Sequence, residues 1–293
     1  MNKYGVPGLP RTIVTLVCTI GCLVGCLPRR SEERIACHIA DRENSDIAYP
    51  ATSLYVMDGD GRNRTRVGEG NQPAWSPDGS KLLFRGRTHR SLHLLDLRTA
   101  ASTTLLEIDD NMDGATWSPG GTEIAFCVHS ESIWMVNVDG SGARELTHFG
   151  DTRWVGRPSW SPTGAKIAFS VSRDGDKSDV YVMNRDGSNI VRLTDGAGDY
   201  DGPIWSPTDE TIAFEKSDGG EPWVCVMNSD GSGQRCLAPG QLYGWSPDGG
   251  RIYFHMPFDD TLWTISRDGS NRRRLFELNC EDPAWSPAMQ RVD

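Results

Sequence analysis

The fold is decided by residues 158–194, which read PSWSPTGAKIAFSVSRDGDKSDVYVMNRDGSNIVRLT. Four short segments have the alternation and composition of β-strands, at 158–160, 166–169, 179–183 and 190–193. A Ser-Pro-Thr-Gly turn separates the first two, because Pro presets φ and Gly suits the last turn position. Asp186 and Gly187 make a hairpin turn before the fourth segment, since Gly tolerates a positive φ. The unit predicts a four-stranded antiparallel sheet.

This unit recurs along the whole chain. The tripeptide Trp-Ser-Pro occurs six times, starting at Trp75, Trp117, Trp160, Trp205, Trp245 and Trp285. The intervals lie between 40 and 45 residues, a period typical of four-stranded propeller blades. A Trp needed once in every blade is expected to pack between blades rather than to stack on a ligand. We therefore expect an all-β propeller.

The two ends of the repeat fix the number of blades. Residues 34–39, 53–57 and 64–67 match the second, third and fourth strands of the unit, yet no Trp-Ser-Pro precedes them. The missing first strand appears at 283–286. A C-terminal strand is thus expected to complete the blade that the N-terminal strands begin, which closes the ring. The sequence predicts a six-bladed β-propeller over residues 34–293.

The N-terminal residues have a different character. Lys3 and Arg11 precede a short apolar stretch, 12–24, that ends in Leu-Val-Gly-Cys at 23–26. This order is typical of an export signal, and the stretch is short for a permanent membrane helix. The four residues resemble the bacterial lipobox, which implies a lipoprotein signal peptide at 1–25, lipid attachment at Cys26 and a short tether at 26–33. A weaker site at Cys22, an ordinary signal peptide or an uncleaved anchor are the alternatives.

Five cysteines lie beyond the lipobox, and an exported protein can hold disulfides. Cys225 and Cys236 flank the turn at 228–233 nearly symmetrically, which favours a cross-strand disulfide between them. Because five is an odd number, one of Cys37, Cys127, Cys225, Cys236 and Cys280 must stay unpaired. No Cys-x-x-Cys motif occurs, which argues against a zinc site.

The pattern Lys166-Ile-Ala-Phe169 and the run from Val180 to Asn189 resemble the WD-like repeat of TolB-type propellers. The resemblance covers about residues 34–293. It implies an envelope scaffold that binds partner proteins. TolB proper also has an N-terminal α/β domain, for which there is no room between Cys26 and Arg34. TolB proper is also soluble in the periplasm, so a lipobox departs from the TolB pattern. The matching residues make turns and core, so the resemblance predicts fold more strongly than function.

Motifs of catalysis and metal binding are scarce in the sequence. It has no His-x-His, His-Glu-x-x-His or Gly-x-Ser-x-Gly motif and no phosphate loop. Asp58, Asp60 and Glu69 imitate part of a calcium loop, but Asn63 stands where its Gly should be. The aspartates at 174, 176 and 179 are expected in a solvated loop. No catalytic residue, metal ligand or cofactor is predicted, with a divalent cation in the channel as an alternative.

The segments just before each Trp-Ser-Pro differ between blades, and they lead into the innermost strands. They are therefore expected to form a mostly acidic mouth of the central channel. The candidate binding residues there are Glu69, Asp110, Asp113, Arg153, Arg157, Asp199, Tyr200, Asp201, Tyr243, Glu281 and Asp282. Loop aspartates also commonly bond their own backbone, so a purely structural role is the competing interpretation.

Charge and motifs together give the functional expectation. The net charge of −10 argues against nucleic acid as a partner, although acidity alone often serves only solubility. We expect a non-catalytic, monomeric propeller of the cell envelope that takes a protein or peptide partner at its acidic mouth and reaches the membrane through its lipid. It would face the periplasm or the cell surface. A metal-assisted lyase or hydrolase and a carbohydrate-binding propeller are the alternatives.

Overall fold

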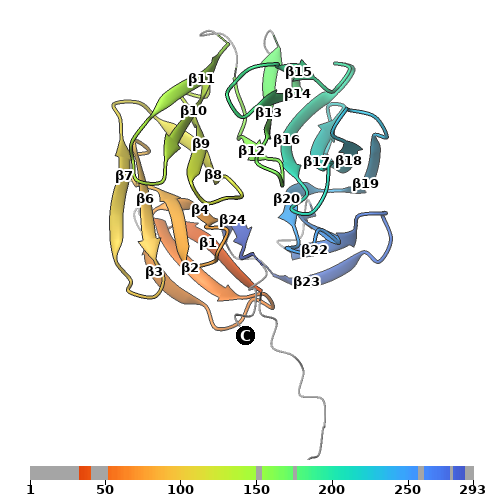
Figure 1. Ribbon diagram of the computed structural model, residues 1–293. Helices are drawn as coiled ribbons and strands as arrows, with labels where there is room; N and C mark the ends of the chain where they lie inside the picture. The colour runs from red at the N-terminus through yellow and green to blue at the C-terminus, as the bar shows by residue number, and fades with distance from the viewer. Residues whose placement is uncertain are drawn as a thin grey trace, which may run out of the picture. The chain divides into compact units, whose positions relative to one another are not determined.

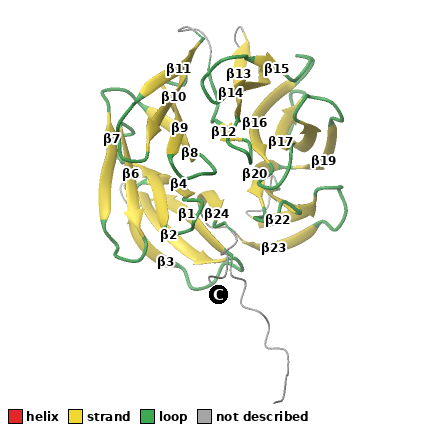
Figure 2. Ribbon diagram, in the orientation of Figure 1, coloured by secondary structure: helices red, strands yellow, loops and turns green. Residues whose placement is uncertain are grey.

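The computed structural model describes residues 33–40, 52–149, 154–173, 177–256, 261–277 and 280–287. The predicted signal peptide, Cys26 and most of the tether lie outside these residues. The described part is all β, with six four-stranded antiparallel sheets arranged as blades in a ring (Figure 1). Figure 2 shows only strands and loops, and no described segment is a helix that could cross a membrane.

Blade 1 unites the two ends of the repeat, because its innermost strand is the last of the described strands. Its strands, from the channel outward, are β24 (Glu281–Trp285), β1 (Arg34–Ala40), β2 (Thr52–Asp58) and β3 (Thr65–Glu69). Ile35 pairs with Trp285 and Ala36 with Ala284, which is the predicted closure. A disulfide between Cys37 and Cys280 adds a covalent link at the same place.

The next two blades follow the chain from the inside outward. Blade 2 comprises β4 (Asn71–Trp75), β5 (Lys81–Arg85), β6 (Ser91–Asp96) and β7 (Ser102–Glu107). Blade 3 comprises β8 (Met112–Trp117), β9 (Glu123–Val128), β10 (Ser132–Asn137) and β11 (Arg144–His148). Both keep the order that the repeat predicted.

The remaining three blades have the same order. Blade 4 comprises β12 (Ser159–Trp160), β13 (Lys166–Arg173), β14 (Lys177–Asn184) and β15 (Val191–Arg192). Blade 5 comprises β16 (Asp199–Trp205), β17 (Thr211–Ser217), β18 (Trp223–Asn228) and β19 (Arg235–Pro239). Blade 6 comprises β20 (Gln241–Trp245), β21 (Arg251–His255), β22 (Thr261–Ser266) and β23 (Arg273–Glu277). Each innermost strand contacts that of the next blade, and β20 contacts β24, so the ring is closed.

The hydrophobic core lies between neighbouring blades, and the repeated Trp residues are part of it. Trp117 packs with Leu83 of blade 2, and Trp160 packs with Cys127 of blade 3. The indole N–H of Trp117 also donates to the carbonyl oxygen of Ala74 in the preceding blade, at 3.2 Å. Burial of such large aromatic surfaces stabilises the contact between blades. The packing role predicted for the tryptophans is therefore confirmed.

The Asp-Gly turns at the outer edge also serve the contact between blades. Gly187 has a φ of +88°, and a Cβ there would lie 2.6 Å from the carbonyl oxygen of Leu146 in blade 3. The position therefore needs Gly both for its backbone conformation and for its close approach to the neighbouring blade. The side chain of Asp186 accepts hydrogen bonds from the backbone N–H and the hydroxyl of Ser188, which stabilise the turn.

Two predictions about single residues have clear outcomes. Cys225 is bonded to Cys236, the pair that flanks the β18–β19 turn, and Cys127 is the free, buried cysteine of the described residues. The expectation that Asp179 lies in a solvated loop is wrong. Asp179 is fully buried on β14, where Thr194 donates to it at 2.7 Å and Arg192 pairs with it at 2.9 Å. Residues 174 and 176 lie outside the described residues.

Candidate functional site

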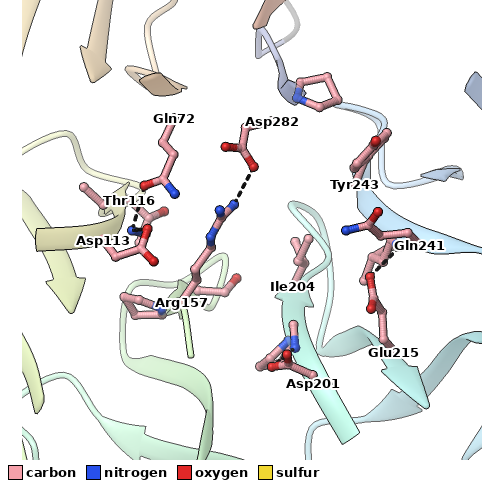
Figure 3. A pocket seen from close by; sticks show the side chains of 18 of the residues that line it. Gln72, Asp113, Thr116, Arg157, Asp201, Ile204, Glu215, Gln241, Tyr243 and Asp282 are labelled. Carbon is pink, nitrogen blue, oxygen red and sulfur yellow. Dashed lines mark hydrogen bonds and ion pairs between the residues drawn. The ribbon is translucent and has the colours of Figure 1, made fainter. Parts of the chain in front are cut away.

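A cavity of about 460 Å³ lies at the channel mouth, where the innermost strands of the six blades converge. Each blade contributes at least one side chain to its wall, among them Gln72, Asp113, Arg157, Asp201, Tyr243 and Asp282. Figure 3 shows these side chains pointing toward a shared space from all around the ring. A cavity therefore lies where the sequence placed the mouth, and its lining combines repeated residues, such as Pro73, Pro158, Pro203 and Pro283, with residues that vary between blades.

Bulges in the innermost strands direct these side chains into the cavity. The pairing of first and second strands shifts register between Asn71 and Ala74, and again between Asp113 and Thr116. The same shift occurs between Asp201 and Ile204. A bulge places an extra residue against one partner and re-aims its neighbours. At Gln72 the extra residue has a φ of 51°, in the left-handed region that non-glycine residues seldom adopt.

An ion pair between opposite blades crosses the cavity. The Nη1 atom of Arg157 in blade 4 lies 2.9 Å from Oδ1 of Asp282 in blade 1. Burial acts to lower the pKa of Arg157, but the carboxylates of Asp282 and Asp113 outweigh it and raise the pKa. Half of the Arg157 side-chain surface (50%) still contacts solvent, because the residue stands in the open channel.

The Arg157–Asp282 pair divides the cavity into two halves, which Figure 3 shows on its two sides. We call the half with Gln72, Asp113 and Thr116 the Asp113 side, and the half with Asp201, Ile204, Glu215, Gln241 and Tyr243 the Asp201 side.

On the Asp113 side, the positively charged side chain of Arg85 lies beneath the wall. Arg85 on β5 lies 3.4 Å from Asp113 and is mostly buried, with 14% of its side chain exposed. Its Nη1 also donates to the Met112 carbonyl oxygen at 3.0 Å, and its Nε donates to Asn71 at 2.8 Å. These contacts hold the guanidinium in place, so the charge of Asp113 is balanced within the protein.

The Asp201 side contains two carboxylates whose partners are uncharged. Asp201 accepts hydrogen bonds from the hydroxyl of Ser170 and from the backbone N–H of Gly202. Glu215 on β17 accepts the backbone N–H of Leu242 at 2.7 Å. Burial raises the pKa of Glu215 to about 7, and the nearby Asp201 adds to the effect, whereas the Leu242 N–H and Arg157 oppose it.

His38 lies behind the Arg157–Asp282 pair. It is 6% exposed, with Nε2 3.4 Å from Glu281 and Nδ1 3.7 Å from Asp282. Burial lowers its pKa although both carboxylates act to raise it, so the ring is neutral at pH 7. Among the described residues no group of three or more His, Cys, Asp or Glu side chains is placed to hold a metal ion.

The structure brings five of the predicted mouth residues into the cavity wall, namely Asp113, Arg157, Asp201, Tyr243 and Asp282. Glu69, Asp110, Asp199, Tyr200 and Glu281 do not line it, and Arg153 lies outside the described residues.

The residues outside the wall have partners of their own. Asp110 pairs with His129 at 2.7 Å, and Glu69 pairs with Arg66 at 2.8 Å. Asp199 accepts the backbone N–H of Ser178 at 2.8 Å. Tyr200 is 2% exposed and donates to Asp195, and burial raises its pKa to about 12. Asp113 and Asp201 also accept backbone N–H groups, from Gly114 at 2.8 Å and Gly202 at 2.7 Å, so the structural interpretation of loop aspartates applies to these two wall residues as well.

Sequence reasoning missed a second layer of residues, which support the wall from beneath. The position directly after the repeated Phe of each second strand holds Arg85, Cys127, Ser170 and Glu215 in blades 2 to 5. Each contacts the mouth segment of the next blade: Arg85 at Asp113, Cys127 at the Gly156 carbonyl oxygen, Ser170 at Asp201 and Glu215 at Leu242. The residue at this repeat position varies between blades although its neighbours repeat, and that variation is the sequence signal that could have revealed this layer. Trp154 and Gln72 in the wall were also missed.

Several curated proteins resemble parts of this chain. An uncharacterized protein of Agrobacterium fabrum is 29% identical over 188 residues, which is 57% of this chain and 63% of that protein. An uncharacterized peptidase of Bacillus subtilis is 31% identical over 112 residues, 35% of this chain and 17% of the peptidase. The Tol-Pal system protein TolB of Gluconobacter oxydans is 33% identical over 105 residues, 31% of this chain and 23% of that protein. The chain thus spans less than two thirds of each of these relatives.

Solved structures share the fold. TolB from Acinetobacter baumannii superposes with a TM-score of 0.72 at 21% identity, covering 88% of this chain and 67% of that one. Oligogalacturonate lyase in complex with manganese superposes with a TM-score of 0.60 at 14% identity, covering 78% and 73%. At such identities the likeness concerns the fold alone. The model of the TolB beta propeller domain matches residues 32–289, nearly the whole chain, and the chain therefore belongs to the TolB beta propeller domain family.

Proposed function

We propose that this protein is a non-catalytic cell-envelope scaffold that binds a segment of a partner protein in the cavity at its channel mouth. The observation that carries the proposal is the cavity wall itself. Four blades share a proline in the wall, at Pro73, Pro158, Pro203 and Pro283, and Asp113 and Asp201 occupy equivalent repeat positions. The position three residues before each repeated Trp varies, however, and it holds Gln72, Arg157, Leu242 and Asp282 in four of the blades. Repetition serves packing between blades, whereas variation around a cavity of about 460 Å³ suits recognition of one particular ligand.

The size and chemistry of the cavity favour a peptide segment. It accommodates a few side chains rather than a whole domain, and it combines carboxylates, an amide, a guanidinium and aromatic rings. The similarity to the Tol-Pal system protein TolB, although it covers only 23% of that protein, supports a role in an envelope assembly.

The proposal includes export and a lipid anchor at Cys26. Two disulfides among the described residues, Cys37–Cys280 and Cys225–Cys236, support an oxidising compartment such as the periplasm or the cell surface. Incorporation of labelled palmitate in the full chain tests the anchor. Labelling is expected to disappear in Cys26→Ser, and continued labelling of that variant would place the lipid elsewhere.

The binding role is tested with the full-length, membrane-extracted protein. Partners are captured from envelope extracts by the wild type and by a charge-reversal variant carrying Asp113→Lys and Asp201→Lys. We expect the variant to lose the captured partner while remaining folded, with a lower melting temperature because Asp113→Lys leaves the Arg85 guanidinium without its opposite charge. A control that carries Asp110→Lys, on a residue outside the cavity wall, is expected to retain the partner. Metal-dependent turnover of an oligosaccharide or ester that the same variant abolishes would refute the scaffold and establish an enzyme.

A further inference from the structure

The two halves of the cavity differ in charge balance. On the Asp113 side, Arg85 neutralises the carboxylate from beneath. On the Asp201 side, Asp201 and Glu215 both line the cavity, and within the described ranges neither has an Arg, Lys or His in ion-pair contact. Their hydrogen-bond donors are a hydroxyl and backbone N–H groups, which orient the carboxylates but leave their negative charge uncompensated.

Aromatic side chains border the same half. Trp154 lines the cavity and is 41% exposed. Its ring lies against Gly156, where an added Cβ would be 3.0 Å from ring carbons and would also clash with the Ser170 hydroxyl that bonds Asp201. The Trp154 backbone N–H donates to Ser172 at 2.7 Å, which fixes its position.

Tyr243 lines the same half from blade 6, and Figure 3 shows it beyond Gln241 as seen from Glu215. An aromatic face beside carboxylates is the arrangement that proteins use to hold an ammonium or guanidinium group. The Arg157 guanidinium forms the boundary with the other half and repels a cation from the middle of the cavity.

We propose that the Asp201 side is a subsite for one cationic side chain, an arginine or a lysine, of the partner segment. Asp201 and Glu215 supply the opposite charge, and Trp154 and Tyr243 flank the alkyl chain and the cationic head. This inference rests on the proposed function and specifies the chemistry of the segment that enters the cavity.

The state of Glu215 gives the subsite a pH dependence. Because the pKa of Glu215 is raised to about 7, part of this residue is protonated at neutral pH. A bound cation favours its charged form, so binding releases protons and becomes tighter as the pH rises from 6 to 8. Other charged groups that face Glu215 are Asp201 and Asp199 from β16 and Arg157 from the segment before β12.

The test uses a random heptapeptide library selected on the full-length protein. In later rounds, bound peptides are released with a peptide selected in the first round, so that only peptides sharing its binding site are recovered. We expect one position of the selected peptides to be enriched in Arg or Lys. A selected arginine peptide and its citrulline counterpart, which is nearly the same shape but neutral, are then titrated by calorimetry. Citrulline is expected to weaken binding at least tenfold, and the loss should grow from pH 6 to pH 8.

Variants locate the effect. Asp201→Asn with Glu215→Gln should bind the arginine and citrulline peptides equally. The matched control Asp110→Asn with Glu69→Gln, which removes two charges near the mouth but outside the wall, should keep the tenfold preference. Peptides that bind in the cavity without a cationic residue, or a preference that survives in the Asp201/Glu215 variant, would overturn the subsite and leave the scaffold function intact. Failure of every peptide to bind would overturn both.

Discussion

The replacement Glu215→Gln tests the electrostatics of the cavity without any ligand. Burial raises the pKa of Glu215 from its ordinary value of 4.5 to about 7, so folding disfavours its charged form. The group then weakens folding as the pH rises from about 4.5 through 7, and its effect is constant above that range. With about 1.4 kcal/mol for each tenfold change, the full loss is about 3 kcal/mol. Glutamine keeps an oxygen that can accept the Leu242 N–H but never becomes charged.

The measurement is the free energy of unfolding in denaturant, under oxidising conditions, for both proteins between pH 4 and pH 9. The variant should match the wild type near pH 4 and exceed it by about 3 kcal/mol at pH 8. The comparison between two proteins cancels the titration of all other groups. A difference in unfolding free energy that stays constant across this pH range would refute the environment assigned to Glu215. A difference that grows as the pH falls would show that the pKa of Glu215 is lowered rather than raised.

Further predictions concern the core, the turns and the disulfides. The Cys127 thiol is fully buried and burial raises its pKa, so it should not react with a thiol reagent until the protein unfolds, and rapid native-state labelling would contradict its placement. Gly187→Ala should cost about 2 kcal/mol or more, from a positive φ and a clash with the next blade, as judged by the shift in denaturant midpoint. Gly219→Ala, with a similar φ and open space around it, should cost less; equal losses would exclude the clash. Cys280→Ser should lower the free energy of unfolding more than Cys236→Ser, by about 5 against about 3 kcal/mol, because the disulfides close loops with sequence separations of 243 and 11. The reverse order of the two losses would contradict this expectation.

The sequence predicted the architecture well because the fold repeats. Trp-Ser-Pro and Asp-Gly each recur with their strands, so an error in one blade is corrected by the others, and the unmatched ends at 34–39 and 283–286 lead directly to ring closure. The predicted strand at 190–193 is shorter in the structure, at Val191–Arg192, since strand ends depend on pairing with β14.

The site was predicted less completely because it depends on bulges and on contacts between blades. Asp199 and Asp201 are two residues apart in the regularly paired part of β16, yet only Asp201, next to the bulge, lines the wall, while Asp199 bonds Ser178. Glu215 comes from a second strand, and its contact with the mouth segment of the next blade is suggested only when the equivalent positions of several blades are compared. Asp179 was misplaced because its partner Arg192 lies one strand away, which charge patterning along the chain does not reveal.

The position of β24 in the chain has a consequence for the order of assembly. This strand is made after all the others, and it carries Asp282, while Cys280 just before it bonds to Cys37 on β1. During synthesis, strands β1 to β3 therefore lack their inner partner strand, β24, until that late segment has been made. The cavity gains its cross-channel ion pair at that same moment, so the cavity wall is complete only once the ring is closed, and a product truncated before β24 would lack it.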